Sequence, residues 1–169
     1  MESIALVEEK RKKDVEKEEI AQYVTFIIQN EVYGVEVLKV QEIIGMTKIT
    51  AMPNSLPFMK GVIDLRGAVV PVIDLRLKFE MEQAEYNNFT VIIIVEVKDR
   101  LVGMIVDSVS DVLSIPVHSI QETPSFSAKI NTEYMQGIGQ KDDTLVIILD
   151  VDRILTTAEF EIINEDHEE

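Results

Sequence analysis

The chain of 169 residues carries 16 basic and 31 acidic side chains, so its formal net charge at pH 7 is −15. A field of that sign repels phosphate groups, which disfavours binding to nucleic acids and to anionic lipid surfaces. Apolar residues make up 46% of the chain, enough for a buried core, and the absence of cysteine excludes disulfides and thiol chemistry. The aliphatic runs are far shorter than the ~20 residues of a membrane helix and the first residues do not form a signal peptide, so we expect a cytoplasmic protein.

The chain begins with a charged stretch and changes to strand periodicity after about residue 20. Residues 1–20 mix basic and acidic side chains with few large apolar ones, so we interpret them as an arm outside the core. Residues 23–28 and 32–37 flank a turn at residues 29–31, which predicts a hairpin. Apolar residues then recur at helical spacing and predict one or two helical turns from about Leu38. These residues are Val37, Val40, Ile43 and Ile44.

A second hairpin is predicted near the middle of the chain. Its strands, residues 62–65 and 68–75, are joined at Arg66-Gly67, where glycine accepts a positive φ without steric cost. Pro71 lacks an N–H group, so we expect its strand to lie at a sheet edge or to be bulged at that point.

The unit Asp-Leu-Arg occurs twice, at residues 64–66 and 74–76. Residues two apart in a strand share a face, so each aspartate can lie beside its own arginine. One interpretation is a pair of solvated surface ion pairs that contribute about 0–1 kcal/mol each. The other makes Arg66, at the tip of a turn, a recognition residue.

The second half of the chain is also rich in β-branched residues. Strands are predicted at residues 90–97, 101–106, 112–117, 134–139 and 144–151. A polar break at residues 107–111 separates the second of these from the third. Short helical turns are predicted at residues 76–79, and a terminal helix at residues 152–164. The expected apolar face of that helix consists of Ile154, Leu155, Ala158 and Ile162.

The two halves match weakly in the same order. The matched pairs are Gly34 with Gly103, 69 residues apart, and Gly61 with Gly137 and Asp74 with Asp150, each 76 residues apart. This repeat predicts two small all-β units of about five strands each, which would close into barrels because closure removes exposed strand edges. Chance similarity between β-rich segments is the alternative.

The sequence shows no catalytic constellation, so we predict that the protein is not an enzyme. Its two histidines, His118 and His167, have no spacing typical of a metal site, and neither a phosphate-binding loop nor a dinucleotide fingerprint is present. We therefore expect no cofactor and no metal. A small hydrolase that uses Asp64 or Asp74 with His118 is the alternative from another functional class.

A non-enzymatic barrel pair would act through its surface. Candidate contact residues lie on turns and at the ends of helical segments, and they are Val40, Glu42, Arg66, Val91 and Val112. For the three valines, ordinary core packing is the alternative.

Three long motifs give this sequence its family resemblance. They are YGVEVLKVQEI at residues 33–43, MKGVIDLRGAVVPVIDLR at residues 59–76 and VGMIVDSVSDV at residues 102–112. Together they resemble the CheW family of bacterial chemotaxis coupling proteins, over residues 22–155. The resemblance implies two SH3-like five-stranded β-barrels on a shared core, with short helical turns and a C-terminal helix. It also implies a scaffold that couples transmembrane chemoreceptors to the histidine kinase CheA.

The resemblance assigns roles to individual residues. Glu42 and Arg66 match positions tied to contacts with the kinase regulatory domain and with neighbours in the array rings, and Val40 lies beside them. Val91 and Val112 match positions assigned to the receptor tip, whose apolar side chains would dock between the barrels. The protein would be cytoplasmic and recruited to membrane-associated receptor arrays. A regulatory adaptor of the CheV type is the alternative within signalling.

These observations predict three parts of the chain. Residues 1–20 form the charged arm, residues 21–156 the CheW-like domain, and residues 157–169 the end of the helix and an acidic tail. Within the domain, the first barrel spans roughly residues 21–86 and the second roughly residues 87–151, and strands can be exchanged between the two.

Overall fold

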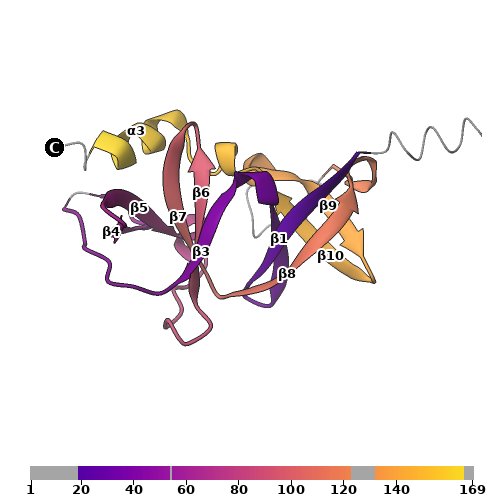
Figure 1. The fold of residues 1–169 in the computed structure, drawn as a ribbon, viewed down its shortest axis with the longest axis horizontal. Helices are drawn as coiled ribbons and strands as arrows, with labels where there is room; N and C mark the ends of the chain where they lie inside the picture. Colours follow the sequence, from indigo (N-terminus) through magenta and orange to yellow (C-terminus); the bar gives the residue numbers. More distant parts are fainter. Residues whose placement is uncertain (1–18, 54, 123–131, 166–169) are drawn as a thin grey trace, which may run out of the picture.

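The computed structural model describes residues 19–53, 55–122 and 132–165, so most of the charged arm and the acidic tail lie outside the described residues. In the described part, ten strands form two five-stranded sheets (Figure 1). The strands are β1 (Ile20–Ile28), β2 (Glu31–Glu36), β3 (Val40–Gly45), β4 (Met59–Leu65), β5 (Ala68–Asp74), β6 (Val91–Val97), β7 (Arg100–Val106), β8 (Ser108–Pro116), β9 (Met135–Lys141) and β10 (Thr144–Leu149). The predicted all-β class is confirmed, and the two sheets are consistent with SH3-like barrels.

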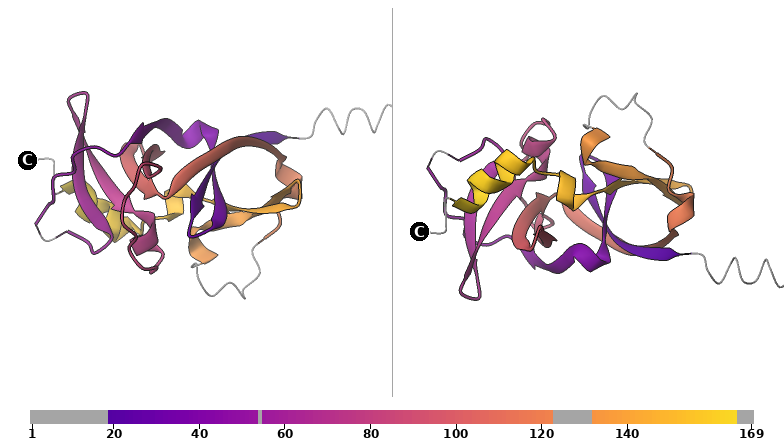
Figure 2. Two further views of the ribbon diagram at one scale, coloured as in Figure 1. Left: turned by 90° about the horizontal axis from the view of Figure 1, so that it is seen from below. Right: turned by 90° about the horizontal axis from the view of Figure 1, so that it is seen from above.

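Each half of the chain contributes to both sheets. Sheet A has the strand order β8-β1-β2-β10-β9, and sheet B has the order β3-β6-β7-β5-β4. The first half therefore gives β1 and β2 to sheet A and β3, β4 and β5 to sheet B. The second half gives β6 and β7 to sheet B and β8, β9 and β10 to sheet A. Figure 2 shows the strands of sheet A curling into a barrel beside sheet B. The sheets do not divide at the predicted boundary near residue 86, because the chain crosses between them after β2 and again after β7, which is the strand exchange that the sequence prediction allowed.

The two crossings are short, and a side chain of the second one links the two sheets. A three-residue 3₁₀ turn, η1 (Val37–Lys39), follows β2, and a single residue, Asp107, separates β7 from β8. The Asp107 carboxylate accepts hydrogen bonds from Nε and Nη2 of Arg76 at 2.8 and 2.5 Å and from the N–H of Gln29 at 2.9 Å. Burial alone would raise the pKa of Asp107, but these hydrogen bonds outweigh it and hold the pKa below its usual value. The carboxylate thus ties the β1–β2 turn of sheet A to the segment after β5 of sheet B.

The internal repeat is visible in the topology. Gly34 on β2 pairs antiparallel with β1 and parallel with β10, while Gly103 on β7 pairs antiparallel with β6 and parallel with β5. Asp74 and Asp150 each accept backbone N–H bonds at the start of the helical turn that follows their strand. Residues that matched in the sequence therefore occupy equivalent places in the two sheets.

Three apolar clusters fill the molecule. One lies around Tyr23 and is enclosed by the strands of sheet A, and one lies around Ile92 and is enclosed by the strands of sheet B. The largest, which we call the shared core, receives side chains from both sheets, including Phe26 from β1 and Ile93 from β6. Each fully buried side chain of this size contributes about 1.5–3 kcal/mol to folding. Because the shared core draws on both sheets, it stabilises their packing against each other.

Four two-residue turns join the hairpins with backbone that has positive φ at both residues. They are Gln29-Asn30, Arg66-Gly67, Lys98-Asp99 and Asp142-Asp143. Such turns match the twist of the strands that they connect. The turns predicted at residues 29–31 and at Arg66-Gly67 are confirmed.

A helix was predicted where the chain forms β3. Only η1 is helical, and Val40–Gly45 is a strand paired with β6 along its length, with a bulge between Val40 and Glu42. Its side chains alternate between half-buried and exposed positions, so its partner strand, rather than the local spacing of apolar residues, decides its conformation.

Of the polar break predicted at residues 107–111, residues 108–111 are instead part of β8. This strand lies at the edge of sheet A next to β1, and one extra residue bulges where Thr25 is followed by Phe26. The Thr25 hydroxyl donates to the Asp111 carbonyl at 3.0 Å and accepts from the Asp111 N–H. An edge strand tolerates exposed polar side chains because only one of its sides is paired.

Pro71 also differs from expectation, because β5 lies inside sheet B rather than at its edge. The parallel ladder between β5 and β7 covers Val72 to Asp74 only. Pro71 therefore lies one residue before that ladder, where its missing N–H group costs no bond to β7.

The C-terminal helix begins later than predicted. After a 3₁₀ turn, η4 (Val151–Arg153), the helix α3 (Thr157–Glu165) starts at a capping box in which Thr156 and Glu159 each accept the other's backbone N–H. Ala158 and Ile162 are exposed, and Ile163 is the buried isoleucine. The Glu159 carboxylate also accepts from the buried amine of Lys78, at 2.8 Å, which fixes α3 along the outside of sheet B (Figure 1).

We predict that Gly61→Ala strongly destabilises the fold whereas Gly45→Ala does not. A Cβ atom at Gly61 would lie 2.1 Å from the Thr50 carbonyl oxygen, and its φ of +144° is unfavourable for other residues, whereas a Cβ at Gly45 meets nothing within 4 Å. Denaturant unfolding should show a loss of about 2–5 kcal/mol for Gly61→Ala and a change within about 1 kcal/mol for Gly45→Ala. Equal stabilities for the two variants would contradict the assigned packing of β4.

Candidate interaction surfaces

Glu42 and Arg66, 24 residues apart in sequence, form an exposed ion pair. Arg66 Nη2 donates to Glu42 Oε1 at 2.5 Å and Nη1 donates to Oε2 at 3.2 Å, so the contact is bidentate. The Arg66 side chain is 72% exposed and that of Glu42 is 27% exposed. Glu42 lies on β3 and Arg66 in the turn after β4, and these are the two edge strands of sheet B. The pair therefore links the two edges of the sheet and remains open to a partner.

The electrostatics of this pair follow from the hydrogen bonds. Hydrogen bonding to Arg66 lowers the pKa of Glu42, and hydrogen bonding to Glu42 raises the pKa of Arg66. Both groups are therefore charged at neutral pH, and together they present a cation and an anion in a fixed geometry. A charged pair of this kind sets orientation and partner choice more than affinity.

The sequence interpretation of each Asp-Leu-Arg unit as an aspartate beside its own arginine is wrong. Asp64 accepts the N–H of Gly67 at 2.8 Å and so stabilises the turn, while Arg66 bonds to Glu42. Asp74 caps the short helix α2 (Leu75–Lys78), while Arg76 bonds to Asp107. The turn at residues 66–67 directs Arg66 away from Asp64, and the helix after Asp74 does the same for Arg76.

Val40 is half-buried at the beginning of β3. It pairs with Val95, whose side chain belongs to the shared core, and Val40 packs against that cluster. Directly paired residues of neighbouring strands point to the same face, so Val40 points toward the shared core whereas Glu42 belongs to the opposite face. Val40 is therefore both a core residue and a candidate contact residue. It borders the shared core, and it lies two residues from Glu42 of the exposed ion pair.

Val91 and Val112 lie on different sheets but border the same core layer. Val91, at the start of β6, is half-buried and packs against the shared core. Val112 on β8 is 53% exposed and pairs with Val24 of β1, on the face that also carries Phe26 of the shared core. The structure thus excludes ordinary core packing for Val112.

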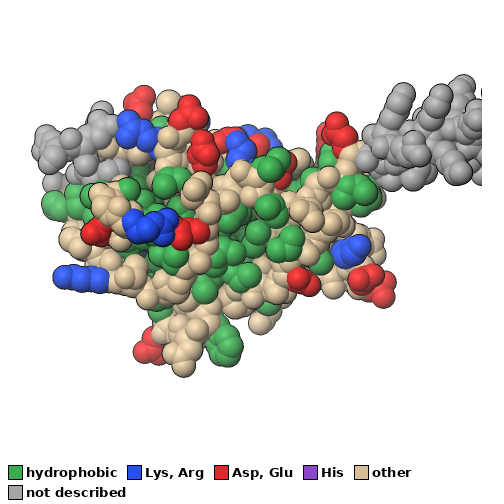
Figure 3. Space-filling view, viewed as in Figure 1, with side chains coloured by type: hydrophobic (Ala, Val, Ile, Leu, Met, Phe, Trp, Pro, Cys, Tyr) green, Lys and Arg blue, Asp and Glu red, His purple; other side chains and the backbone are tan. Residues whose placement is uncertain are grey.

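Two further apolar side chains extend this border. Ile43 on β3 is 40% exposed and pairs with the shared-core residue Ile93, and Val109 on β8 is 36% exposed and pairs with Phe26. We call Ile43, Val91, Val109 and Val112 the apolar strip. Figure 3 shows apolar side chains gathered across the middle of the face that presents β3, β1 and β8.

Sequence analysis missed Ile43 and Val109 as surface residues. Ile43 was assigned to the apolar side of a helix, and Val109 to a polar break. A strand assignment for β3 would have separated Ile43 from Glu42, because successive residues of a strand lie on opposite faces.

The hydrolase alternative gains no support from the positions of its residues. Asp74 is 2% exposed, and its carboxylate accepts from the N–H of Arg76 and from the Tyr86 hydroxyl at 2.7 Å. His118 lies in the short helix η2 (Val117–Ser119), which follows β8 of sheet A. In the described ranges, no three histidine, aspartate or glutamate side chains are grouped so that they could hold a metal ion. None of the helices described there has the length and apolar character needed to cross a membrane.

Comparisons with known proteins agree on one family. Residues 22–159 match the family model of the CheW-like domain. The chain is 39% identical over 143 residues to a chemotaxis protein CheW of Klebsiella aerogenes, covering 85% of this chain and 86% of the relative. It is 36% identical to a probable chemotaxis protein CheW of Rhizobium etli, covering 82% and 89%. The crystal structure of a CheW scaffolding protein from Thermoanaerobacter tengcongensis matches with a TM-score of 0.77 at 32% identity, covering 83% of this chain and 91% of that one.

We predict that Arg66→Gln raises the pKa of Glu42, because the hydrogen bonds that favour the carboxylate are lost. A folded-state pKa that is lowered contributes stability above the pKa of the unfolded chain, and this contribution disappears as the pH falls through the folded-state value. The pH dependence of the Glu42 carboxyl ¹³C shift measures the effect directly. Lys141→Gln removes a distant exposed cation and should leave the Glu42 titration unchanged. A Glu42 titration that is the same in Arg66→Gln and in the unmodified chain would contradict the ion pair.

Proposed function

This chain belongs to the CheW-like domain family, a family of chemotaxis scaffolds, and from that membership we propose that it couples transmembrane chemoreceptors to the histidine kinase CheA. It would act by binding alone, without catalysing a reaction and without a cofactor. It would function in the cytoplasm, where receptor arrays recruit it to the membrane.

One observation carries this proposal. The molecule presents two chemically different surfaces, the Glu42–Arg66 pair across sheet B and the apolar strip along the border of the two sheets. A coupling protein needs two surfaces that can be occupied at once, and a fixed charged pair and an apolar strip select different partners.

The charged pair fits the kinase. We assign Glu42, Arg66 and the neighbouring Val40 to contacts with the CheA regulatory domain and with neighbours in array rings. Arg66 is the most exposed of the three and its guanidinium is already oriented by Glu42, so less side-chain freedom is lost when a partner binds. Val40 supplies an apolar contact next to the charges.

The apolar strip fits the receptor. We assign Val91 and Val112 to contacts with the cytoplasmic receptor tip, a helical hairpin with apolar side chains on one face. A small apolar surface with a polar rim gives a modest interface that can exchange partners. Ile43 and Val109 belong to the same strip and would widen the contact.

We predict that two substitutions separate the two interactions. Arg66→Glu places a second carboxylate beside Glu42 and should weaken binding to a CheA regulatory domain by about tenfold or more, with receptor binding unchanged. Val112→Glu places a charge in the apolar strip and should weaken binding to a receptor-tip fragment more than binding to the kinase. Calorimetric titration of each variant against each partner measures both affinities.

Matched controls exclude general effects of charge and folding. Lys141→Glu is the control for Arg66→Glu, because it makes the same change in net charge on the exposed β9–β10 hairpin of sheet A. Leu145→Glu is the control for Val112→Glu, because it places a glutamate at an exposed apolar residue of that hairpin. Both should bind as the unmodified chain does. Unchanged kinase affinity of a folded Arg66→Glu variant would refute the assigned kinase surface. Failure of the unmodified chain to bind either partner would refute the coupling role.

A further inference from the structure

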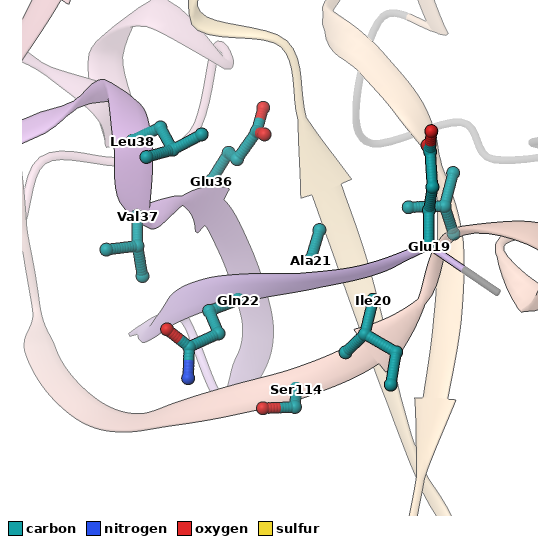
Figure 4. Close-up of a pocket in the computed structure, with 9 residues that line it drawn as sticks. Glu19, Ile20, Ala21, Gln22, Glu36, Val37, Leu38 and Ser114 are labelled. Carbon is teal, nitrogen blue, oxygen red and sulfur yellow. The ribbon is translucent and has the colours of Figure 1, made fainter. Parts of the chain in front are cut away.

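An open hollow lies where the first residues of β1 meet η1 and the end of β8. Its volume is about 580 Å³, and Figure 4 shows that its walls come from these three elements and from Glu36 at the end of β2, while Val117 of η2 completes the lining. The apolar side chains that line it include Ile20, Leu38 and Val117, which are 61%, 86% and 37% exposed. The hollow lies on sheet A and is distinct from the apolar strip.

The fold does not explain why these apolar side chains are exposed. Ile20, Leu38 and Val117 belong to none of the three core clusters. Exposed apolar residues scattered singly are common, but three of them around one hollow form a patch that is typical of a binding site. An occupant with apolar side chains would cover this patch.

The charge of the hollow restricts that occupant further. Glu19 and Glu36 line it, and neither carboxylate forms an ion pair with a cation of the described residues. Two carboxylates that have no cationic partner among the described residues, beside an apolar surface, favour a ligand that carries lysine or arginine next to an apolar residue.

We propose that the occupant is the chain's own N-terminal segment, residues 1–18. This segment contains Lys10-Arg11-Lys12-Lys13 followed by Val15, and it enters the described structure at Glu19, which is itself part of the hollow's wall. Lys10 is nine residues from Glu19, and each residue spans up to about 3.3 Å, so the cations can reach Glu36. The tether gives a local concentration in the millimolar range, so a weak contact suffices.

The charge of the chain and the covalent attachment of residues 1–18 beside the hollow favour this segment over a second copy of the chain. A second copy of the chain has a formal net charge of −15, and two such molecules repel each other. Residues 1–18 carry five basic and six acidic side chains, but four of the basic ones are consecutive at positions 10–13, and the segment is attached where they are needed. The inference does not rest on the proposed function, because it concerns contacts within one molecule.

Nuclear magnetic resonance on the full-length chain tests the proposal. Because the chain has no cysteine, Leu38→Cys can carry a single nitroxide label beside the hollow. We expect strong paramagnetic broadening of the amide signals of residues 10–15. The matched control is Val69→Cys, an exposed apolar position on sheet B, which should leave those signals sharp. Absence of broadening from the Leu38 label in a folded chain would overturn the proposal.

A second measurement avoids any label in the hollow. Charge reversal of Lys10, Arg11, Lys12 and Lys13 to glutamate should shift the amide signals of Glu36, Val37 and Leu38, and leave the signals around Val69 unchanged. High salt should reduce the broadening from the Leu38 label, since the contact is partly ionic. Broadening that appears only between labelled and unlabelled copies in a mixed sample would show that another molecule is the occupant and would also overturn the proposal.

Discussion

The exchange of strands between the two sheets is the constraint on which the rest of the structure depends. Neither half of the chain can complete a five-stranded sheet, because each half gives its first two strands to one sheet and its last three to the other. The shared core and the bonds of Asp107, at the second crossing, to Arg76 and Gln29 hold the two sheets together. The molecule therefore folds as one unit, although its sequence contains a twofold repeat.

This arrangement also builds the two proposed surfaces. The short turn after β2 delivers β3 to the edge of sheet B, where Glu42 meets Arg66 and Ile43 is left exposed beside the shared core. The crossing after β7 starts β8 at the edge of sheet A, which brings Val112 to the border of the same core. Residues from both halves thus form the apolar strip, while the charged pair stays within sheet B.

Sequence reasoning predicted the hairpins well, because turns with positive φ have a strong local signature, as at Arg66-Gly67. It failed where tertiary pairing overrides local spacing, as in β3, whose residues Val40 and Ile43 are compatible with a helix until β6 pairs with them. The family motifs located Glu42 and Arg66 but not their mutual bond, since nothing in an Asp-Leu-Arg unit indicates a partner 24 residues away. The roles assigned to the surface residues remain predictions.

We propose that one molecule binds kinase and receptor at the same time through separate surfaces. The most direct measurement is the mass of the assembly formed when the chain is mixed with a CheA regulatory domain and a receptor-tip fragment, both in excess. We predict a complex that contains all three proteins, with each partner's affinity little changed by the other. Displacement of the kinase domain by the receptor fragment, or of the fragment by the kinase domain, would contradict it.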